Sequence, residues 1–305
     1  MKVAWNGVYP AVTTNFHEDE SLDLVTFKQN IDQQINAGVD GIIVCGSLGE
    51  NGVLSTDEKL AVLNGALEAA QGRVPVIICI AETTTRAAIN FAKTSAHQGA
   101  HGFMLLPPML YASDDRETLT YLHKVADATD LPIMLYNNPV AYKTLITIDM
   151  FKDLAQNPKF EAVKESTGDI RYLTDMINAL GDRFKILSGV DNLALESLMM
   201  GADGWVAGLV CAFPAETVAI YQLALQGRYQ EALEIYRWFY PLLHLDVSTK
   251  LVQNIKLAEA LTNLGTEHVR EPRLKLSGQE RDNVIKIIET GLAQRPTLPS
   301  LVSSL

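Results

Sequence analysis

The chain has few cysteines and no long apolar run. Its three cysteines, Cys45, Cys79 and Cys211, show no C-x-x-C spacing, which is typical of a reduced, cytoplasmic protein. No stretch approaches the roughly 18 uncharged apolar residues that a membrane-spanning helix needs. Residues 1–12 also lack an apolar core of signal-peptide length. We therefore expect a cytoplasmic location and no membrane partner.

Excess positive charge and nucleotide-binding motifs are missing as well. The net charge is −11, which argues against a surface for nucleic acid or anionic membranes. The negative net charge does not exclude an anionic substrate, because a few local hydrogen-bond donors suffice to bind a carboxylate. No G-x-G-x-x-G motif follows the first expected strand, and there is no Walker A motif. The six histidines have no metal-ligand spacing, so we expect no metal.

The sequence instead shows short β-rich runs that alternate with longer amphipathic runs. Glycine-containing segments at 37–41, 98–102 and 200–204 separate the units, each typical of a helix end that leads into a strand. The expected strands are residues 7–13, 41–45, 74–80, 102–106, 133–136, 162–164, 185–187 and 204–206. Eight such units predict an α/β fold, a (β/α)₈ TIM barrel over residues 1–225. A doubly wound sheet is the main alternative.

The pattern changes after residue 225. Helical patterns at 229–245, 249–264 and 278–292 have no strands between them. They predict a C-terminal helical extension over residues 226–305, in which residues 295–300 begin a loose tail.

Lys164 is the most informative residue of the chain. It ends a short apolar strand, and lysine is rarely buried without a reason. Burial favours the neutral amine, which is the nucleophilic form that attacks carbonyl groups. The alternatives are a lysine that extends out of the barrel and one paired with Glu165. If the fold places Lys164 in a pocket, a Schiff base with a carbonyl substrate is expected.

Other candidate residues follow strand ends, where barrel enzymes place their chemistry. Gly46, Ser47 and Leu48 begin a glycine-rich loop whose N–H groups and hydroxyl suit an anion, although a plain turn is an equal alternative. Tyr136 is either a proton shuttle or a rim aromatic. Gly189 permits close approach of a ligand to the backbone. The loop that begins at Ala207 is apolar, which favours a small substrate.

Together these segments resemble the dihydrodipicolinate synthase and N-acetylneuraminate lyase family of Schiff-base barrel enzymes, over about residues 7–272. The segments that carry the resemblance are residues 7–14, 46–50, 136–139, 163–168 and 187–191. The resemblance implies that Lys164 is the Schiff-base lysine, that Tyr136 is the proton shuttle, and that Ser47 holds the carboxylate of a 2-oxo acid or its cyclic imine. It also implies a homotetramer without metal or organic cofactor. Further substrate-binding residues are expected to be Gly46, Leu48, Met109, Gly189 and Ala207.

The chain departs from the synthase pattern at three places. Leu48 stands where the family usually has a second hydroxyl residue, and Met109 stands nearest to a tyrosine pair that reaches a neighbouring subunit. Ala141 lies in the segment where the synthase has an arginine. Leucine and methionine carry no exchangeable proton, so a hydroxyl relay through these positions is excluded. We therefore expect dihydrodipicolinate synthesis to be disfavoured.

The resemblance is strongest to one branch, 1-pyrroline-4-hydroxy-2-carboxylate deaminase. In that reaction Lys164 attacks C2 of the cyclic imine and opens the ring. A proton leaves C3, the C4 hydroxyl leaves as water, and hydrolysis releases ammonia and 2-oxoglutarate semialdehyde.

Four other functions remain open. A 2-keto-3-deoxy sugar-acid dehydratase would use the same lysine on an open-chain substrate. The second and third alternatives are a pyruvate-releasing aldolase or lyase and dihydrodipicolinate synthase. The last is a catalytically silent regulatory barrel, against which the presence of both Lys164 and Tyr136 argues.

Overall fold

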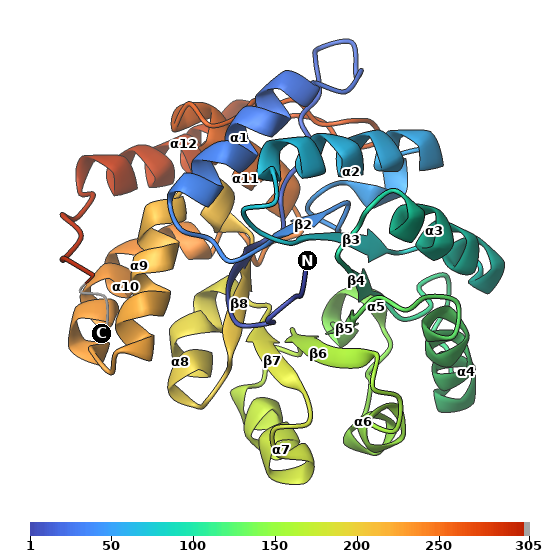
Figure 1. Ribbon diagram of the computed structural model, residues 1–305. Helices are drawn as coiled ribbons and strands as arrows, with labels where there is room; N and C mark the ends of the chain where they lie inside the picture. The colour runs from blue at the N-terminus through green and yellow to red at the C-terminus, as the bar shows by residue number, and fades with distance from the viewer. Residues whose placement is uncertain (302–305) are drawn as a thin grey trace.

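The computed structural model describes residues 1–301 and shows a ring of helices around a central parallel sheet (Figure 1). The strands follow one another around the ring in the order β1-β8-β7-β6-β5-β4-β3-β2. A parallel bridge between Ala11 and Ile43 joins the two end strands and closes the barrel. The strands are β1 (Gly7–Pro10), β2 (Ile42–Val44), β3 (Val76–Ile80), β4 (Gly102–Leu105), β5 (Ile133–Asn137), β6 (Phe160–Glu165), β7 (Lys185–Ser188) and β8 (Gly204–Ala207). The predicted (β/α)₈ TIM barrel is confirmed.

Helices connect the strands and cover the outside of the barrel. They are α1 (Leu24–Asn36), α2 (Thr56–Ala70), α3 (Thr85–His97), α4 (Asp115–Ala126), α5 (Pro139–Tyr142), α6 (Ile148–Leu154), α7 (Ile170–Leu180), α8 (Ala194–Met199) and α9 (Pro214–Leu225). Local signals start several of them: Ser55 and Glu58 form a capping box at α2, and Asp114 and Glu117 form one at α4. No helix within residues 1–301 is long and apolar enough to cross a membrane.

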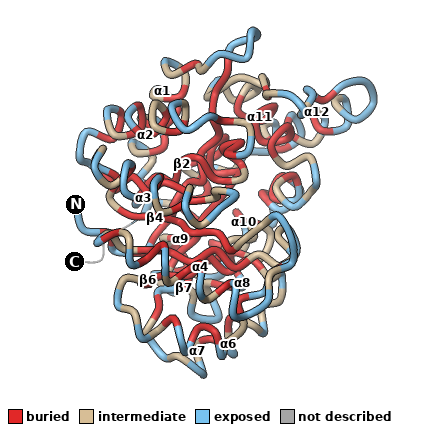
Figure 2. The backbone as a smooth tube through the Cα atoms, turned by 90° about the vertical axis from the view of Figure 1, so that its right-hand side faces the viewer, coloured by how far each residue is buried: buried red, intermediate tan, exposed pale blue. Residues whose placement is uncertain are grey.

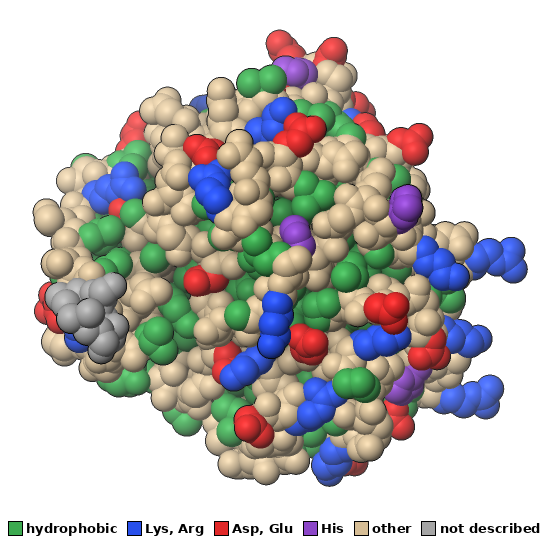
Figure 3. Space-filling view, viewed as in Figure 1, with side chains coloured by type: hydrophobic (Ala, Val, Ile, Leu, Met, Phe, Trp, Pro, Cys, Tyr) green, Lys and Arg blue, Asp and Glu red, His purple; other side chains and the backbone are tan. Residues whose placement is uncertain are grey.

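Two apolar clusters follow from the alternation of side chains along the strands. One fills the barrel interior and includes Ile43, Met104, Met134 and Ala162. The other lies between the strands and the helices. The buried backbone forms the centre of the molecule and the exposed backbone its outer turns (Figure 2). On the face shown in Figure 3, acidic and basic side chains are interspersed.

The C-terminal helices are α10 (Tyr229–Leu243), α11 (Leu251–Leu261) and α12 (Gly278–Ala293). Helix α11 is tied to the barrel by buried polar contacts. The Lys256 ammonium forms an ion pair with Glu50 and donates to the His268 carbonyl at 2.6 Å. The Thr13 hydroxyl donates to the Glu259 carboxylate at 2.8 Å. The extension therefore holds the loops at one end of the barrel.

One short helix was not predicted, and one local expectation was wrong. Helix α5 had not been expected, because four residues are too few for a periodic pattern. Residues 295–300 are not loose. Arg295 forms an ion pair with Glu216, and Arg228 donates to the Ser300 carbonyl at 3.0 Å.

Candidate active site

Lys164 lies at the end of β6, with Tyr136 of β5 and Leu187 of β7 as its register neighbours. Ala162, two residues earlier, belongs to the interior cluster, so the pleat directs Lys164 to the inside as well. The lysine is 7% exposed. The fold therefore places its amine at the mouth of the barrel, where barrel enzymes carry their active sites.

The nearest aromatic partner of this amine is Tyr136. Lys164 Nζ lies 4.2 Å from the centre of the Tyr136 ring, a cation–π distance. Within residues 1–301, Nζ has no hydrogen-bond acceptor and no carboxylate within ion-pair distance, although the carboxyl groups of Asp191 and Asp246 are close enough to interact with its charge. Glu165 points elsewhere, because its carboxylate accepts the Thr167 N–H at 2.6 Å. Burial raises the pKa of Glu165 to about 7. The alternatives of an outward lysine and of a pair with Glu165 were wrong.

Gly189 makes room for the Lys164 side chain. A Cβ at this position would lie 2.7 Å from Lys164 Cε and 2.0 Å from Ser166 Oγ. The Ser166 hydroxyl is buried without a partner among the described residues. The space beside the Gly189 backbone, which we expected a ligand to use, is thus filled by the lysine and by this serine.

The loop after β2 presents unpaired donors. The carbonyls of Gly46 and Ser47 accept the N–H groups of Asn51 and Glu50 at 3.2 Å each, which folds the loop tightly. Gly49 is needed there, because a Cβ would meet the Val12 carbonyl at 3.0 Å. The N–H groups of Ser47 and Leu48 donate to no described residue. Such a turn suits a carboxylate.

Two tyrosines share the corner of the mouth next to this loop. The Tyr136 hydroxyl accepts a hydrogen bond from Asn138 Nδ2 at 3.0 Å. Tyr142, in α5, forms a hydrogen bond with the Ser47 hydroxyl. Its ring lies edge-on to Tyr136, with centroids 5.6 Å apart and planes at 77°. No role was predicted for Tyr142 from the sequence. Its position three residues after Pro139 was the available signal, since one helical turn brings the side chain back over the mouth.

Two further carboxyl groups lie near the lysine on the β7–β8 side. Asp191 is fully buried and accepts from Trp205 Nε1 at 2.9 Å and from the Leu209 N–H at 2.8 Å. A Cβ at Gly208 would meet Asp246 Oδ1 at 2.2 Å, so the Asp246 carboxyl covers the end of β8. Burial, aided by the charge of Asp191, raises the pKa of Asp246 well above its ordinary range. Asp246 comes from a loop of the extension, and no sequence pattern linked it to the barrel.

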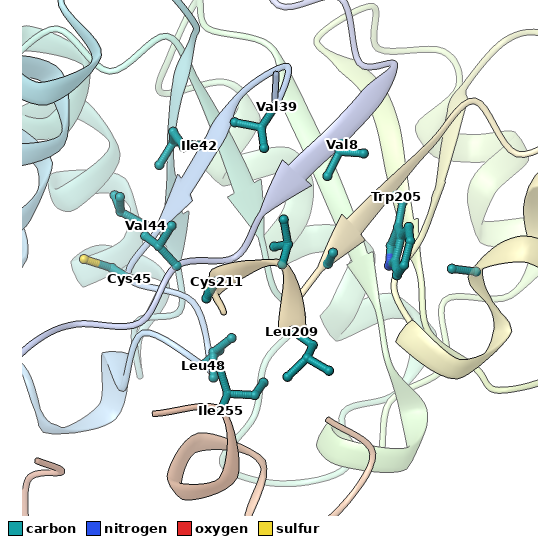
Figure 4. Close-up of a cluster of buried hydrophobic side chains, with 14 of the residues drawn as sticks. Val8, Val39, Ile42, Val44, Cys45, Leu48, Trp205, Leu209, Cys211 and Ile255 are labelled. Atoms are coloured by element: carbon teal, nitrogen blue, oxygen red, sulfur yellow. The ribbon is translucent and has the colours of Figure 1, made fainter. Parts of the chain in front are cut away.

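Three predicted substrate-binding residues belong to, or pack against, the apolar clusters, whereas Ser47 presents its hydroxyl at the mouth of the barrel. Leu48 is 4% exposed and belongs to the outer cluster, next to Ile255 of α11 (Figure 4). The Ala207 side chain also belongs to that cluster, so only its backbone faces the interior side of the strand end. Met109 is half-buried and packs on the interior cluster that contains Tyr136.

Residues 4–291 match the model of the dihydrodipicolinate synthetase family. The chain belongs to this family. It is 31% identical over 290 residues to the 4-hydroxy-tetrahydrodipicolinate synthase of Haloarcula marismortui, with 94% of each chain covered. It is 32% identical to the enzyme of that name from Exiguobacterium sibiricum, over 94% of this chain and 97% of the relative.

Solved structures of the same family are also similar to this chain. Dihydrodipicolinate synthase from Aquifex aeolicus superposes with a TM-score of 0.89 at 26% identity, over 93% of this chain and 97% of the other. A prophage protein of the family from E. coli K12, in complex with pyruvate, gives a TM-score of 0.89 at 26% identity, over 95% of this chain and 99% of the other.

Membership of the dihydrodipicolinate synthetase family confirms the predicted enzyme class. Enzymes of this family are lyases that form a Schiff base on a lysine and use no external cofactor. The deaminase prediction is not confirmed. The comparisons favour dihydrodipicolinate synthase, which was one of the alternative functions predicted from the sequence.

Proposed function

We propose that this protein forms a Schiff base between Lys164 and a small 2-oxo acid. One observation carries the proposal. The structure describes three buried lysines, Lys59, Lys164 and Lys256. Lys59 pairs with Glu82 at 2.7 Å and Lys256 pairs with Glu50, whereas no carboxylate of the described residues lies within ion-pair distance of Lys164. A buried amine that is not engaged in an ion pair is free to approach the carbonyl carbon of a bound substrate.

The neighbouring groups fit the two ends of such a substrate. The free N–H groups of Ser47 and Leu48, with the Ser47 hydroxyl, are suited to hold the carboxylate. Lys164 then attacks the adjacent carbonyl carbon, and the carbinolamine loses water to give the imine. Tyr136, against whose ring the amine lies, is the proposed donor of the proton that leaves with this water. The carbon next to the imine becomes acidic, and loss of its proton is a step that several reactions share.

For the complete reaction, 4-hydroxy-tetrahydrodipicolinate synthesis has the stronger support. The two curated relatives described above carry this name, and they align over 94% of the chain. Pyruvate, bound in one structural relative, is a small 2-oxo acid that fits the proposed Schiff-base step and carries a methyl group next to the carbonyl.

Hydrolytic deamination of 1-pyrroline-4-hydroxy-2-carboxylate is the second candidate. One structural observation favours it. Leu48 is packed among apolar side chains and Met109 packs on the interior cluster, so neither of these positions supplies the hydroxyl that the synthase pattern has there. This reaction needs Lys164 and yields ammonia and 2-oxoglutarate semialdehyde.

One assay tests the Schiff base, and three others separate the reactions. Borohydride is added with pyruvate, and mass spectrometry locates the adduct, which we expect on Lys164. Product formation from pyruvate and aspartate semialdehyde identifies the synthase. Ammonia release from the hydroxypyrroline substrate identifies the deaminase, and turnover of an open-chain deoxy sugar acid identifies the dehydratase. A homotetramer, implied by the family, is part of the proposal and is tested by sedimentation.

A further inference from the structure

Tyr142 is held in place by the same residue that contacts the Tyr136 hydroxyl. Asn138 caps α5: its Oδ1 accepts the Ala141 N–H at 3.0 Å, and its carbonyl accepts the Tyr142 N–H at 3.0 Å. Its Nδ2 donates to the Tyr136 hydroxyl at 3.0 Å. One side chain therefore fixes both the tyrosine beside Lys164 and the short helix that returns the second tyrosine to the mouth.

The resulting corner links the amine to the carboxylate-binding loop. Lys164 lies over Tyr136, Tyr136 meets the edge of Tyr142, and the Tyr142 hydroxyl bonds to Ser47. Tyr136 accepts from Asn138, an amide that takes no proton in return, so the phenolic proton remains available. Tyr142 is half-buried, and its neighbours Ala141 and Lys143 are exposed. Solvent therefore reaches the outer side of this corner.

Tyr142 supplies a hydroxyl that the family pattern places elsewhere. The residues that stand at the pattern's positions, Leu48 and Met109, have no exchangeable proton. The nearest tyrosine after Met109 is Tyr111, which is 56% exposed. Within residues 1–301, its hydroxyl makes no hydrogen bond with Tyr136, Tyr142 or Ser47 and instead lies near Glu117.

We propose that Tyr142 is a proton-relay residue. Its hydroxyl, acting through the Ser47 hydroxyl, returns a proton to Tyr136 within the same subunit. This inference rests on Schiff-base formation at Lys164. When the carbinolamine loses water, Tyr136 gives its proton to the leaving hydroxyl. The Ser47–Tyr142 pair returns one proton to Tyr136 and takes one from solvent, so the site ends with its original protons. Burial raises the pKa of Tyr142, which keeps the hydroxyl protonated for this role.

The test uses pyruvate as the probe and needs no knowledge of the second substrate. The Schiff base acidifies the pyruvate methyl group, so the intact enzyme in D₂O exchanges methyl protons for deuterium, which NMR follows. Tyr142→Phe removes one oxygen and keeps the ring. We expect the saturated exchange rate to fall about 100-fold, the scale of one general acid–base group, while half-saturation changes little. Borohydride trapping of pyruvate on Lys164 should persist.

Tyr111→Phe is the matched control, and we expect exchange within twofold of wild type. Ser47→Ala provides a second variant. It should lower the saturated rate similarly, and the Ser47→Ala/Tyr142→Phe double variant should lose no more, because the two hydroxyls act as one unit. Normal exchange in Tyr142→Phe, or loss of exchange in Tyr111→Phe, would overturn the inference. Wild-type protein that fails to trap pyruvate would instead defeat the proposed function.

Discussion

At the scale of single residues, the absence of a side chain at Gly189 decides where Lys164 lies. We expect Gly189→Ala to displace the lysine, because the added Cβ would lie 2.7 Å from both its Cγ and its Cε. Trapping of pyruvate on Lys164 should fall at least tenfold, measured by mass spectrometry after borohydride reduction.

Gly52→Ala is the control for this substitution. A Cβ there meets nothing within 4 Å, so trapping should stay at the wild-type level. Equal trapping in Gly189→Ala and wild type would show that the lysine does not need the space beside Gly189.

Glu165 predicts a pH dependence of stability. Its folded pKa is raised from 4.5 to about 7, mainly by burial. The folded protein therefore retains a proton that the unfolded chain loses between these values, and the free energy of unfolding falls as the pH rises through this window. Glu165→Gln removes the ionisation while its amide oxygen still accepts the Thr167 N–H. Relative to wild type, the variant should gain stability between pH 5 and pH 8 in urea titrations. A difference in the free energy of unfolding between Glu165→Gln and wild type that stays constant or shrinks as the pH rises would contradict this account.

At the scale of elements, the loop after β2 depends on α11. Lys256 is fully buried against Glu50, whose second oxygen accepts the Arg270 N–H at 3.2 Å. Removal of Lys256 leaves the buried Glu50 charge with only Arg273, whose guanidinium lies 3.9 Å from the second carboxylate oxygen and is 35% exposed. We expect Lys256→Met to lower the free energy of unfolding by about 3–5 kcal/mol, measured by urea titration.

Lys28→Met tests the same change at the surface. Lys28 and Glu68 are 3.2 Å apart, but their side chains are 40% and 67% exposed. The free energy of unfolding should therefore fall by less than about 1 kcal/mol in Lys28→Met. Similar losses in the two variants would show that the Glu50–Lys256 pair does not anchor the loop.

Most elements could be predicted because long helices and buried strands leave periodic patterns. Strand β6 was expected at 162–164 and extends over Phe160–Glu165, an error at its ends alone. Helix α5 was missed because its position depends on a cap and on contacts with Ser47 and Tyr136, none of which leaves a period in the sequence.

At the scale of the whole molecule, the motifs indicated the family and the alternation of strand and helix patterns indicated the barrel. Which residues meet at the site could be seen only in the folded structure. Lys164 and Tyr136 were predicted from their strand ends, and the closed sheet brings them together. Asp246 and Tyr142 were not, because their proximity to the mouth depends on how a distant helical segment and a short turn fold over the barrel. The division into a barrel and an extension at residue 225 remains a proposal. The buried contacts of Lys256 and Glu259 lead us to infer that the two parts unfold together.

The central claim is that Lys164 forms the Schiff base, and borohydride trapping tests it most directly. Wild-type protein reduced in the presence of pyruvate should carry one adduct, located by peptide mass spectrometry on Lys164, and Lys164→Ala should carry none. An adduct on Lys59 or Lys256 would contradict the account. So would the absence of any adduct with pyruvate, with other 2-oxo acids and with the hydroxypyrroline carboxylate.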